Sequence, residues 1–239
     1  AVICSHVSNV FGFIQPLSQL AELCRKQGIP LIVDASQSAG MLPLDMEKLG
    51  AAFIAMPGHK GLYGPQGTGL LLCGRDGEPL LEGGTGSASL QQTMPEFLPD
   101  RLEAGTHNVA GIAGLLEGIR FVRGMGEERI LAHERALLAQ AVEGLRALPE
   151  LQVYASDEPR WQSGVCSLRS SRIDCEELGE ALGRREVALR AGLHCAPLAH
   201  QTADTLQTGT VRLSVSAFNS EGEIRRFLEH LRAVLEDNG

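Results

Sequence analysis

The stretch MPGHKGLYGPQGTG, residues 56–69, joins two apolar segments through a loop with five glycines, one histidine and one lysine. Lys60 follows a strand-like segment, at the position where side chains of an α/β sheet open toward a ligand crevice. Glycines let the backbone approach a ligand closely, and a desolvated lysine amine becomes a nucleophile and a base. The loop is therefore a candidate site, although a lysine in a glycine-rich loop is usually solvated.

The segments around this loop alternate between helical and strand-like patterns. PLSQLAELCRKQG, residues 16–28, has apolar positions at helical spacing and ends in a glycine, which predicts a helix. IPLIVDASQSAG, residues 29–40, predicts a strand that ends in polar residues, and residues 46–61 repeat helix and strand more briefly. The apolar run GTGLLLCG, residues 67–74, is typical of a strand covered on both faces. Together these segments predict an α/β layer with a mostly parallel sheet.

A long segment without periodicity follows the predicted sheet. Residues 83–106 are rich in glycine, serine, threonine, glutamine and proline, and loops of this length in a compact domain are usually functional or mobile. We expect a ligand to bind near this loop or to be covered by it. Beyond it, residues 108–126 and 126–148 show helical periodicity, and the second helix is long enough to cross between domains.

The last third of the chain predicts a small α+β domain that begins near Pro149. The expected strands are residues 151–155, 164–170, 187–192 and 210–216, and the expected amphipathic helices are residues 174–183 and 220–235. At the other end, AVICSHVSN opens on an apolar run that resembles the middle of a buried strand. We therefore expect the sequence to be a piece of a longer chain.

The composition predicts a soluble globular protein. The chain has 239 residues, 44% of them hydrophobic, which is enough to bury the core of one large or two modest domains. The formal net charge of -8 would repel a nucleic-acid backbone. No apolar run approaches the roughly 20 residues of a membrane helix, so we expect neither nucleic acid nor a membrane as a partner.

The cysteines predict free thiols and a reducing cytoplasm. Six of them are scattered singly without CxxC pairs, in a chain large enough to fold without covalent staples. Four lie in apolar or helical stretches and are expected to be small buried hydrophobes: Cys4, Cys24, Cys73 and Cys166. We predict no metal site, because cysteine and histidine lack ligand spacing.

Asp34 is the second candidate residue of the predicted sheet. It ends an apolar strand, so its carboxylate should reach the same sheet edge as Lys60, where a buried carboxylate needs a cation. The simpler interpretation is that Asp34 or Ser36 caps the next helix, as both residue types often do. These residues alone leave the two interpretations open.

Several blocks, in order along the chain, resemble one family. They are SHVSNVFGFIQPL, VDASQSAG, PGHKGLYGPQGTG, RLEAGTHNVAGIAGL, RAGLHCAPLAH and TVRLSVSAFNSEGEIRRF. The chain resembles the fold-type I pyridoxal-phosphate (PLP) enzymes of the class V aminotransferase group, and specifically the cysteine desulfurase and selenocysteine lyase branch. The resemblance covers essentially the whole chain. The sequence lacks the N-terminal part that members of the family have, a block of about 100 or more residues ahead of SHVSN.

The resemblance implies a fold and an assembly. Residues 1–125 would be the C-terminal portion of the PLP-binding large domain, with a mostly parallel sheet of the PLP-transferase type. Residues 126–149 would form a linking helix and residues 150–239 the small α+β domain. Thr106 resembles the residue that reaches the phosphate in the neighbouring subunit's site. A homodimer is therefore implied, with residues 83–106 close to its interface.

The resemblance also implies a cofactor site for pyridoxal 5'-phosphate. Lys60 would carry the internal aldimine, and Asp34 would pair with the pyridinium nitrogen. Gln37 would hydrogen-bond the phenolic oxygen, and His59 would reach toward the phosphate. An ionised Asp34 would keep the ring nitrogen protonated, so that the ring accepts the electrons left when the substrate Cα loses its proton.

Two residues resemble the family's substrate-binding positions, and Cys195 resembles its nucleophile. Asn9 would border the substrate, and Arg212 would grip the α-carboxylate with its planar guanidinium. Without the family, Arg212 would be a strand arginine paired with a surface carboxylate, and Asn9 a turn residue. Cys195 would otherwise be an inert thiol, but positive charge on His194 or His200 could lower its pKa.

The resemblance implies that L-cysteine is converted to L-alanine. Lys60 would act as the base, the Cys195 thiolate would take the sulfur as a persulfide, and an acceptor protein would receive it. The loop HKGLYGPQG has one residue more than the HKLYGP form of well-known desulfurases, so the substrate stays open. The alternatives are a selenocysteine lyase or another class V enzyme, or a catalytically incomplete fragment that acts only as a structural or interaction module.

Overall fold

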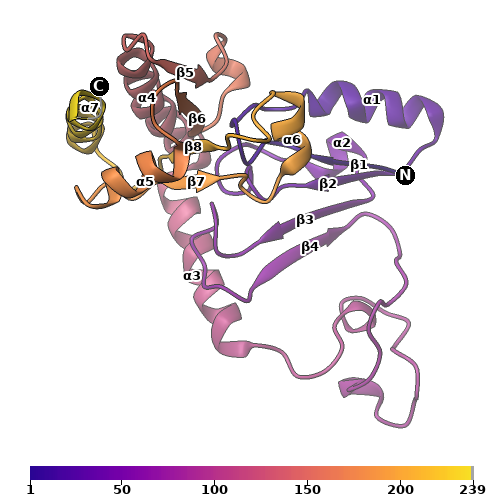
Figure 1. Cartoon of the computed structure of the whole chain (residues 1–239). Helices are drawn as coiled ribbons and strands as arrows, with labels where there is room; N and C mark the ends of the chain where they lie inside the picture. The colour runs from indigo at the N-terminus through magenta and orange to yellow at the C-terminus, as the bar shows by residue number, and fades with distance from the viewer. Residues whose placement is uncertain (238–239) are drawn as a thin grey trace. The chain divides into compact units, whose positions relative to one another are not determined.

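The computed structural model describes residues 1–237 and divides the chain into two compact units (Figure 1). The first unit consists of residues 1–5 and 17–124. The second consists of residues 6–16 and of the chain from residue 125 onward. A short segment near the start of the chain therefore belongs to the same unit as the C-terminal half.

The first unit is built on a four-stranded sheet with the order β1-β2-β3-β4. Its strands are β1 (Val2–Ser5), β2 (Leu31–Asp34), β3 (Phe53–Pro57) and β4 (Gly69–Cys73). The first three run parallel, and β4 runs antiparallel to β3. The predicted mostly parallel α/β layer is confirmed.

Helix α1 (Leu17–Gln27) shows why the sequence folds this way locally. Its buried residues Leu17, Ala21 and Cys24 recur at helical spacing and pack with Leu31 of β2. The unit also contains the short helix α2 (Met46–Leu49) and the longer helix α3 (Val109–Met125).

Strand β4 differs from the prediction. The sequence predicts a strand covered on both faces, but Leu70, Leu71 and Leu72 are 37%, 50% and 41% exposed. Successive side chains of a strand point to opposite faces, so both faces of β4 are open to solvent. The physical reason is that neither buried hydrophobic cluster of the described residues includes a residue of β4, so no packed layer covers its side chains. β4 is also an edge strand, which pairs with β3 alone among the described residues.

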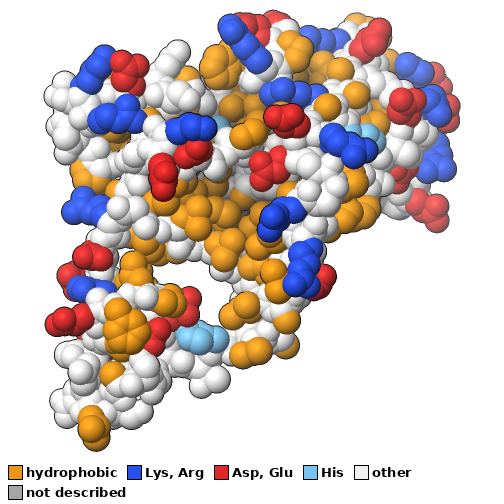
Figure 2. All heavy atoms as spheres, turned by 180° about the vertical axis from the view of Figure 1, so that it is seen from behind, with side chains coloured by type: hydrophobic (Ala, Val, Ile, Leu, Met, Phe, Trp, Pro, Cys, Tyr) orange, Lys and Arg blue, Asp and Glu red, His pale blue; other side chains and the backbone are white. Residues whose placement is uncertain are grey.

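The segment between β4 and α3 is a long loop, as the sequence predicts. Its only regular elements are the short 3-10 helices η1 (Gly86–Ala88) and η2 (Asp100–Leu102), and it extends away from the sheet (Figure 1). Figure 2 shows hydrophobic side chains on its surface. The largest of these exposed side chains are Leu80, Leu81, Leu90, Phe97 and Leu98.

The second unit contains an antiparallel sheet with the order β5-β6-β8-β7. The strands are β5 (Leu151–Tyr154), β6 (Val165–Ser170), β7 (Arg190–Gly192) and β8 (Thr210–Ser214). The helices are α4 (Glu127–Arg146), α5 (Cys175–Gly183), α6 (Pro197–Thr202) and α7 (Glu221–Asp237), with η3 (Pro159–Trp161) between β5 and β6. The predicted α+β arrangement is confirmed, and α6 is an addition to it.

Residues 6–16 are tied to the second unit by hydrogen bonds to β6 and to the segment that precedes it. Ser167 Oγ donates to the Val10 carbonyl at 2.6 Å, and Gln162 Nε2 donates to the Phe11 carbonyl at 2.9 Å. These contacts fix the position of Asn9 within the second unit. No helix among residues 1–237 is both long and apolar enough to cross a membrane.

Candidate functional site

The carboxyl ends of the parallel strands bring Asp34 and Lys60 to the same edge of the first unit's sheet. Asp34 is the last residue of β2, and Lys60 lies in the turn that follows β3. Ser5 Oγ, at the end of β1, donates to Asp34 Oδ2 at 3.3 Å, and the Ser36 amide donates to Oδ1 at 2.8 Å. Asp34 thus caps a turn, because no α-helix begins in the described chain between β2 and α2.

Two glycines hold the loops of this edge together. A Cβ at Gly40 would collide with the carbonyl oxygen of Gly61, and a Cβ at Gly61 would collide with that of Ala39. Gly40 also has a φ of 82°, which L side chains rarely adopt. The loop that carries Gln37 is therefore packed backbone to backbone against the loop that carries Lys60. From the sequence, glycines around Lys60 are expected to let the backbone approach a ligand. Gly40 and Gly61 instead let two loops of the protein approach each other.

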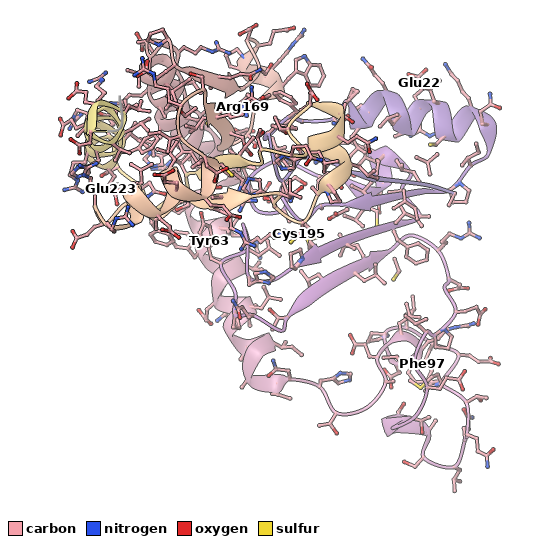
Figure 3. The ribbon with its side chains drawn as sticks, viewed as in Figure 1. Glu22, Tyr63, Phe97, Arg169, Cys195 and Glu223 are labelled. Carbon is pink, nitrogen blue, oxygen red and sulfur yellow. The ribbon has the colours of Figure 1, made fainter. Side chains whose placement is uncertain are left out.

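The Lys60 turn is also braced from within. The Tyr63 amide donates to the Lys60 carbonyl at 2.9 Å, and the Gly64 amide donates to the Gly58 carbonyl at 2.7 Å. Figure 3 labels Tyr63, whose ring meets Phe121 of α3 edge-on at 5.2 Å. The backbone of the turn is thus fixed, while the side chains of Lys60 and its neighbour His59 are exposed.

Thr106 does not belong to the strand ends that carry Asp34 and Lys60. It lies just ahead of α3. Its side chain is exposed, and it makes no hydrogen bond within residues 1–237. Close by, Asn108 Oδ1 accepts from the Gly111 amide at 3.0 Å and so caps the start of α3. Thr106 is therefore held beside a capped helix end with its hydroxyl free for another partner.

The second unit brings Arg212, Asn9 and His194 together. Arg212 Nη1 donates to the Asn9 carbonyl at 2.8 Å, and Asn9 Nδ2 donates to the His194 carbonyl at 2.7 Å. Neither of the simpler interpretations applies. Arg212 forms no ion pair among the described residues, and the Asn9 side chain donates to a distant main-chain carbonyl. Burial lowers the pKa of Arg212, the charge of Arg190 lowers it further, and Cys195 acts in the opposite direction.

Cys195 is the one exposed cysteine of the six, all of which lie within the described chain. It occupies the loop between β7 and α6, where Figure 3 labels it. Cys24, Cys166 and Cys175 are buried, and Cys4 and Cys73 are partly buried. Burial raises the pKa of Cys166 to about 12, which makes that thiol inert.

The prediction that histidine charge acts on Cys195 is wrong at neutral pH. The pKa of His194 is lowered to about 4. Burial is the main cause, and electrostatic interactions with Arg212 and with His200 lower the pKa further. Burial also lowers the pKa of His200. Both rings are therefore mostly neutral at pH 7, and Arg212 is the cation that interacts with Cys195. Within residues 1–237, no group of three or more histidine, cysteine or acidic residues could hold a metal ion.

Two hydrogen bonds near the candidate residues, Ser5 to Asp34 and Asn9 to His194, differ in how well the sequence could predict them. Ser5, which donates to Asp34, could have been found because it ends the strand beside β2. The bond from Asn9 to His194 joins residues 185 positions apart and has no local pattern. Sequence reasoning therefore missed the contact that connects Asn9 to the Cys195 loop.

These features define an α/β protein with an acid and a lysine at the carboxyl edge of a parallel sheet, and a second α+β unit that carries an exposed thiol. A family model, "Aminotransferase class-V", matches residues 1–227. A "Probable cysteine desulfurase" of Mycolicibacterium paratuberculosis is 34% identical over 98% of this chain and 34% of its own length. One of Pyrococcus abyssi is 33% identical over 98% of this chain and 59% of its own length.

A solved structure agrees with these relatives. The apo structure of a cysteine desulfurase from Thermococcus onnurineus NA1 has a TM-score of 0.89 and 34% identity, over 99% of this chain and 60% of that one. The chain therefore belongs to the aminotransferase class-V family. It spans about 34–60% of the length of these relatives.

Proposed function

We propose that the chain supplies catalytic residues of a PLP-dependent cysteine desulfurase, which converts L-cysteine to L-alanine. The observation that supports the proposal is that Asp34 and Lys60 follow neighbouring parallel strands at the same sheet edge, on loops that the Gly40–Gly61 contact holds together. The names of the similar proteins support the choice of reaction. Because those relatives are longer, the activity is proposed for the protein to which this sequence belongs.

The residues present fit pyridoxal 5'-phosphate. The amine of Lys60 would hold its aldehyde, the carboxylate of Asp34 would pair with its ring nitrogen, and Gln37 and His59 would bind its phenolic oxygen and phosphate. The half-buried Asp34 suits a ring cation, since two neutral donors, Ser5 Oγ and the Ser36 amide, hold its carboxylate in place. When bound, the cofactor withdraws electrons from the substrate Cα.

The chain's own residues would divide the remaining work. Arg212 would hold the substrate α-carboxylate beside Asn9, and Lys60 Nζ would take the Cα proton and return a proton. The Cys195 thiolate would form a bond to the substrate sulfur while the substrate Cβ–S bond breaks. Cysteine and the Cys195 thiol would thus give alanine and a Cys195 persulfide, with no outside oxidant.

The proposal extends to partners. A sulfur-acceptor protein would take the persulfide sulfur, and Thr106 would reach the cofactor phosphate in a second copy of the chain, which makes a homodimer. A persulfide carrier needs a free thiol, and all six cysteines are free, which suits the cytoplasm.

The cofactor is tested by absorption and borohydride trapping. The purified protein with added pyridoxal phosphate should gain a visible band, and borohydride should fix the cofactor to Lys60, as read by peptide mass. Lys60→Ala should lose band and label, while Lys48→Ala, at an exposed lysine paired with Asp45, should keep both. Label on Lys48 instead of Lys60 would refute the assignment.

The reaction is tested at Cys195. Cys195→Ser should stop alanine and sulfide formation from cysteine and leave the visible band intact, and Cys73→Ser should change neither. Unchanged turnover in Cys195→Ser would overturn the desulfurase assignment. Comparing cysteine with selenocysteine separates a desulfurase from a selenocysteine lyase.

A second candidate function is a structural or interaction module without catalysis, and the cofactor experiment separates it from the desulfurase. A colourless protein that gains no band with added cofactor, yet folds, would favour this module.

A further inference from the structure

The backbone beside Cys195 adopts a conformation that needs support. His194 and Cys195 have φ values of 50° and 57°, two successive non-glycine residues in the left-handed region. This region is unfavourable for L side chains, and such residues persist only where their surroundings hold them. Identifying what holds this turn therefore identifies what orients the thiol.

The side chain of His194 anchors one side of the turn. Its Nε2 lies 3.1 Å from both the carbonyl oxygen and the Oγ1 of Thr210, at the start of β8. Its ring also lies beside that of His200, with centroids 5.5 Å apart. These contacts fix the His194 ring but do not involve the peptide group that follows it, which lies inside a turn closed by the bond from the Ala196 amide to the Leu193 carbonyl.

The side chain of Asn9 holds that peptide group. Asn9 Nδ2 donates at 2.7 Å to the carbonyl of His194, which belongs to the same planar peptide unit as the Cys195 nitrogen. The bond therefore restrains the His194 ψ and the Cys195 φ together. Arg212 in turn holds the backbone of Asn9, because Arg212 Nη1 donates to the main-chain carbonyl of Asn9 at 2.8 Å.

We propose that Asn9 is a positioning residue, which fixes the Cys195 turn through the His194 carbonyl and connects that turn to Arg212. The inference rests on the proposed function for its catalytic meaning, but the link itself is independent of any reaction. Arg212 Nε is buried without a partner among residues 1–237, so this arginine keeps donor capacity for an anion. One residue, Asn9, then separates an anion-binding group from the backbone of the nucleophile.

Hydrogen exchange tests the link without requiring activity. In Asn9→Ala, the Ala196 amide, which donates to the Leu193 carbonyl at 2.9 Å, should exchange at least about tenfold faster. Peptides from β6 and α7 should keep their protection. Asn9→Asp has the same shape but no N–H donor, so it should behave like Asn9→Ala.

Two results would overturn the proposal. One is wild-type exchange at residues 193–196 in Asn9→Asp, because the donated bond would then not matter. The other is a loss of protection throughout the second unit in both variants, because Asn9 would then hold the unit and not the turn.

Kinetics separate positioning from substrate binding. If Asn9 only binds the substrate carboxylate, Asn9→Ala should raise KM. If Asn9 positions Cys195, Asn9→Ala should lower kcat by about tenfold or more with a smaller change in KM. A rise in KM alone would contradict the proposal. If the wild-type chain releases no alanine, the proposed function fails, and the exchange experiment still decides the link.

Discussion

Leu71 of β4 and Leu168 of β6 both lie within a strand of a four-stranded sheet, but their surroundings differ completely. Leu71, in the first unit, is 50% exposed, whereas Leu168, in the second, is 0% exposed. Helices α4, α5 and α7 pack around the second sheet and bury a large cluster that includes Leu168. The buried cluster of the first unit is smaller and contains no residue of β4.

We expect this difference in burial to give the two units different local stabilities. Burial of apolar area is the main favourable contribution to folding, so the second unit, with its closed core, should be harder to unfold than the first, whose sheet is partly open. Cys24 is buried in the first unit and Cys166 in the second, so pulsed thiol labelling reports on each unit separately. Trp161, the chain's one tryptophan, lies in the second unit and adds a fluorescence signal there.

The largest expected effect comes from truncating one leucine in each sheet. Leu168→Ala should destabilise the second unit by about 2–5 kcal/mol, because it leaves a cavity in a closed core. Denaturant unfolding followed by Trp161 fluorescence measures this change in the free energy of unfolding.

Leu71→Ala is the matched control in the first unit. Its side chain is already half exposed, so the cost should be below about 0.5 kcal/mol, as measured by labelling of Cys24. Equal costs for the two variants would show that the difference in burial does not govern stability.

The next effect is a dependence on pH that only the second unit should show. Glu134 of α4 is the one acidic residue among the buried side chains that the structure describes, and burial raises its pKa to about 7. Because the pKa of Glu134 is higher in the folded than in the unfolded state, protonation of this carboxyl stabilises the fold. The stabilisation is complete when the pH is below the pKa of the unfolded state. That stability is lost as the pH rises through about 7.

Glu134→Gln should remove this dependence. Relative to the variant, the wild-type second unit should lose up to about 3 kcal/mol between pH 4.5 and pH 8. Unfolding followed by Trp161 fluorescence across this range measures the difference, and Cys24 labelling in the first unit should not change with the substitution. A difference between wild type and variant that stays constant with pH would contradict the raised pKa.

The sequence could predict the features that depend on local pattern. The placement of Asp34 and Lys60 at one sheet edge follows from parallel strands, whose carboxyl ends share an edge. The exposure of β4 could not be predicted, because an apolar run is the same in a covered strand and in an open one. The neutrality of His194 and its bond to Asn9 depend on burial and on a contact 185 residues apart. Such properties exist only once the chain has folded.

The smallest expected effect compares one helix cap in each unit. Asp174 Oδ1 accepts from the Glu176 amide at 2.8 Å at the start of α5, and Asp45 Oδ1 accepts from the Lys48 amide at 3.0 Å at the start of α2. Asp174→Ala should cost about 1 kcal/mol, because α5 buries residues in the core of the second unit.

Asp45→Ala should cost less, because α2 has four residues and none of them is buried. Trp161 fluorescence measures the first substitution and Cys24 labelling the second. Asparagine, which also accepts at an N-cap, should restore most of the stability at position 174. A larger loss from Asp45→Ala than from Asp174→Ala would mean that the open first unit depends on its short helix more than its burial indicates.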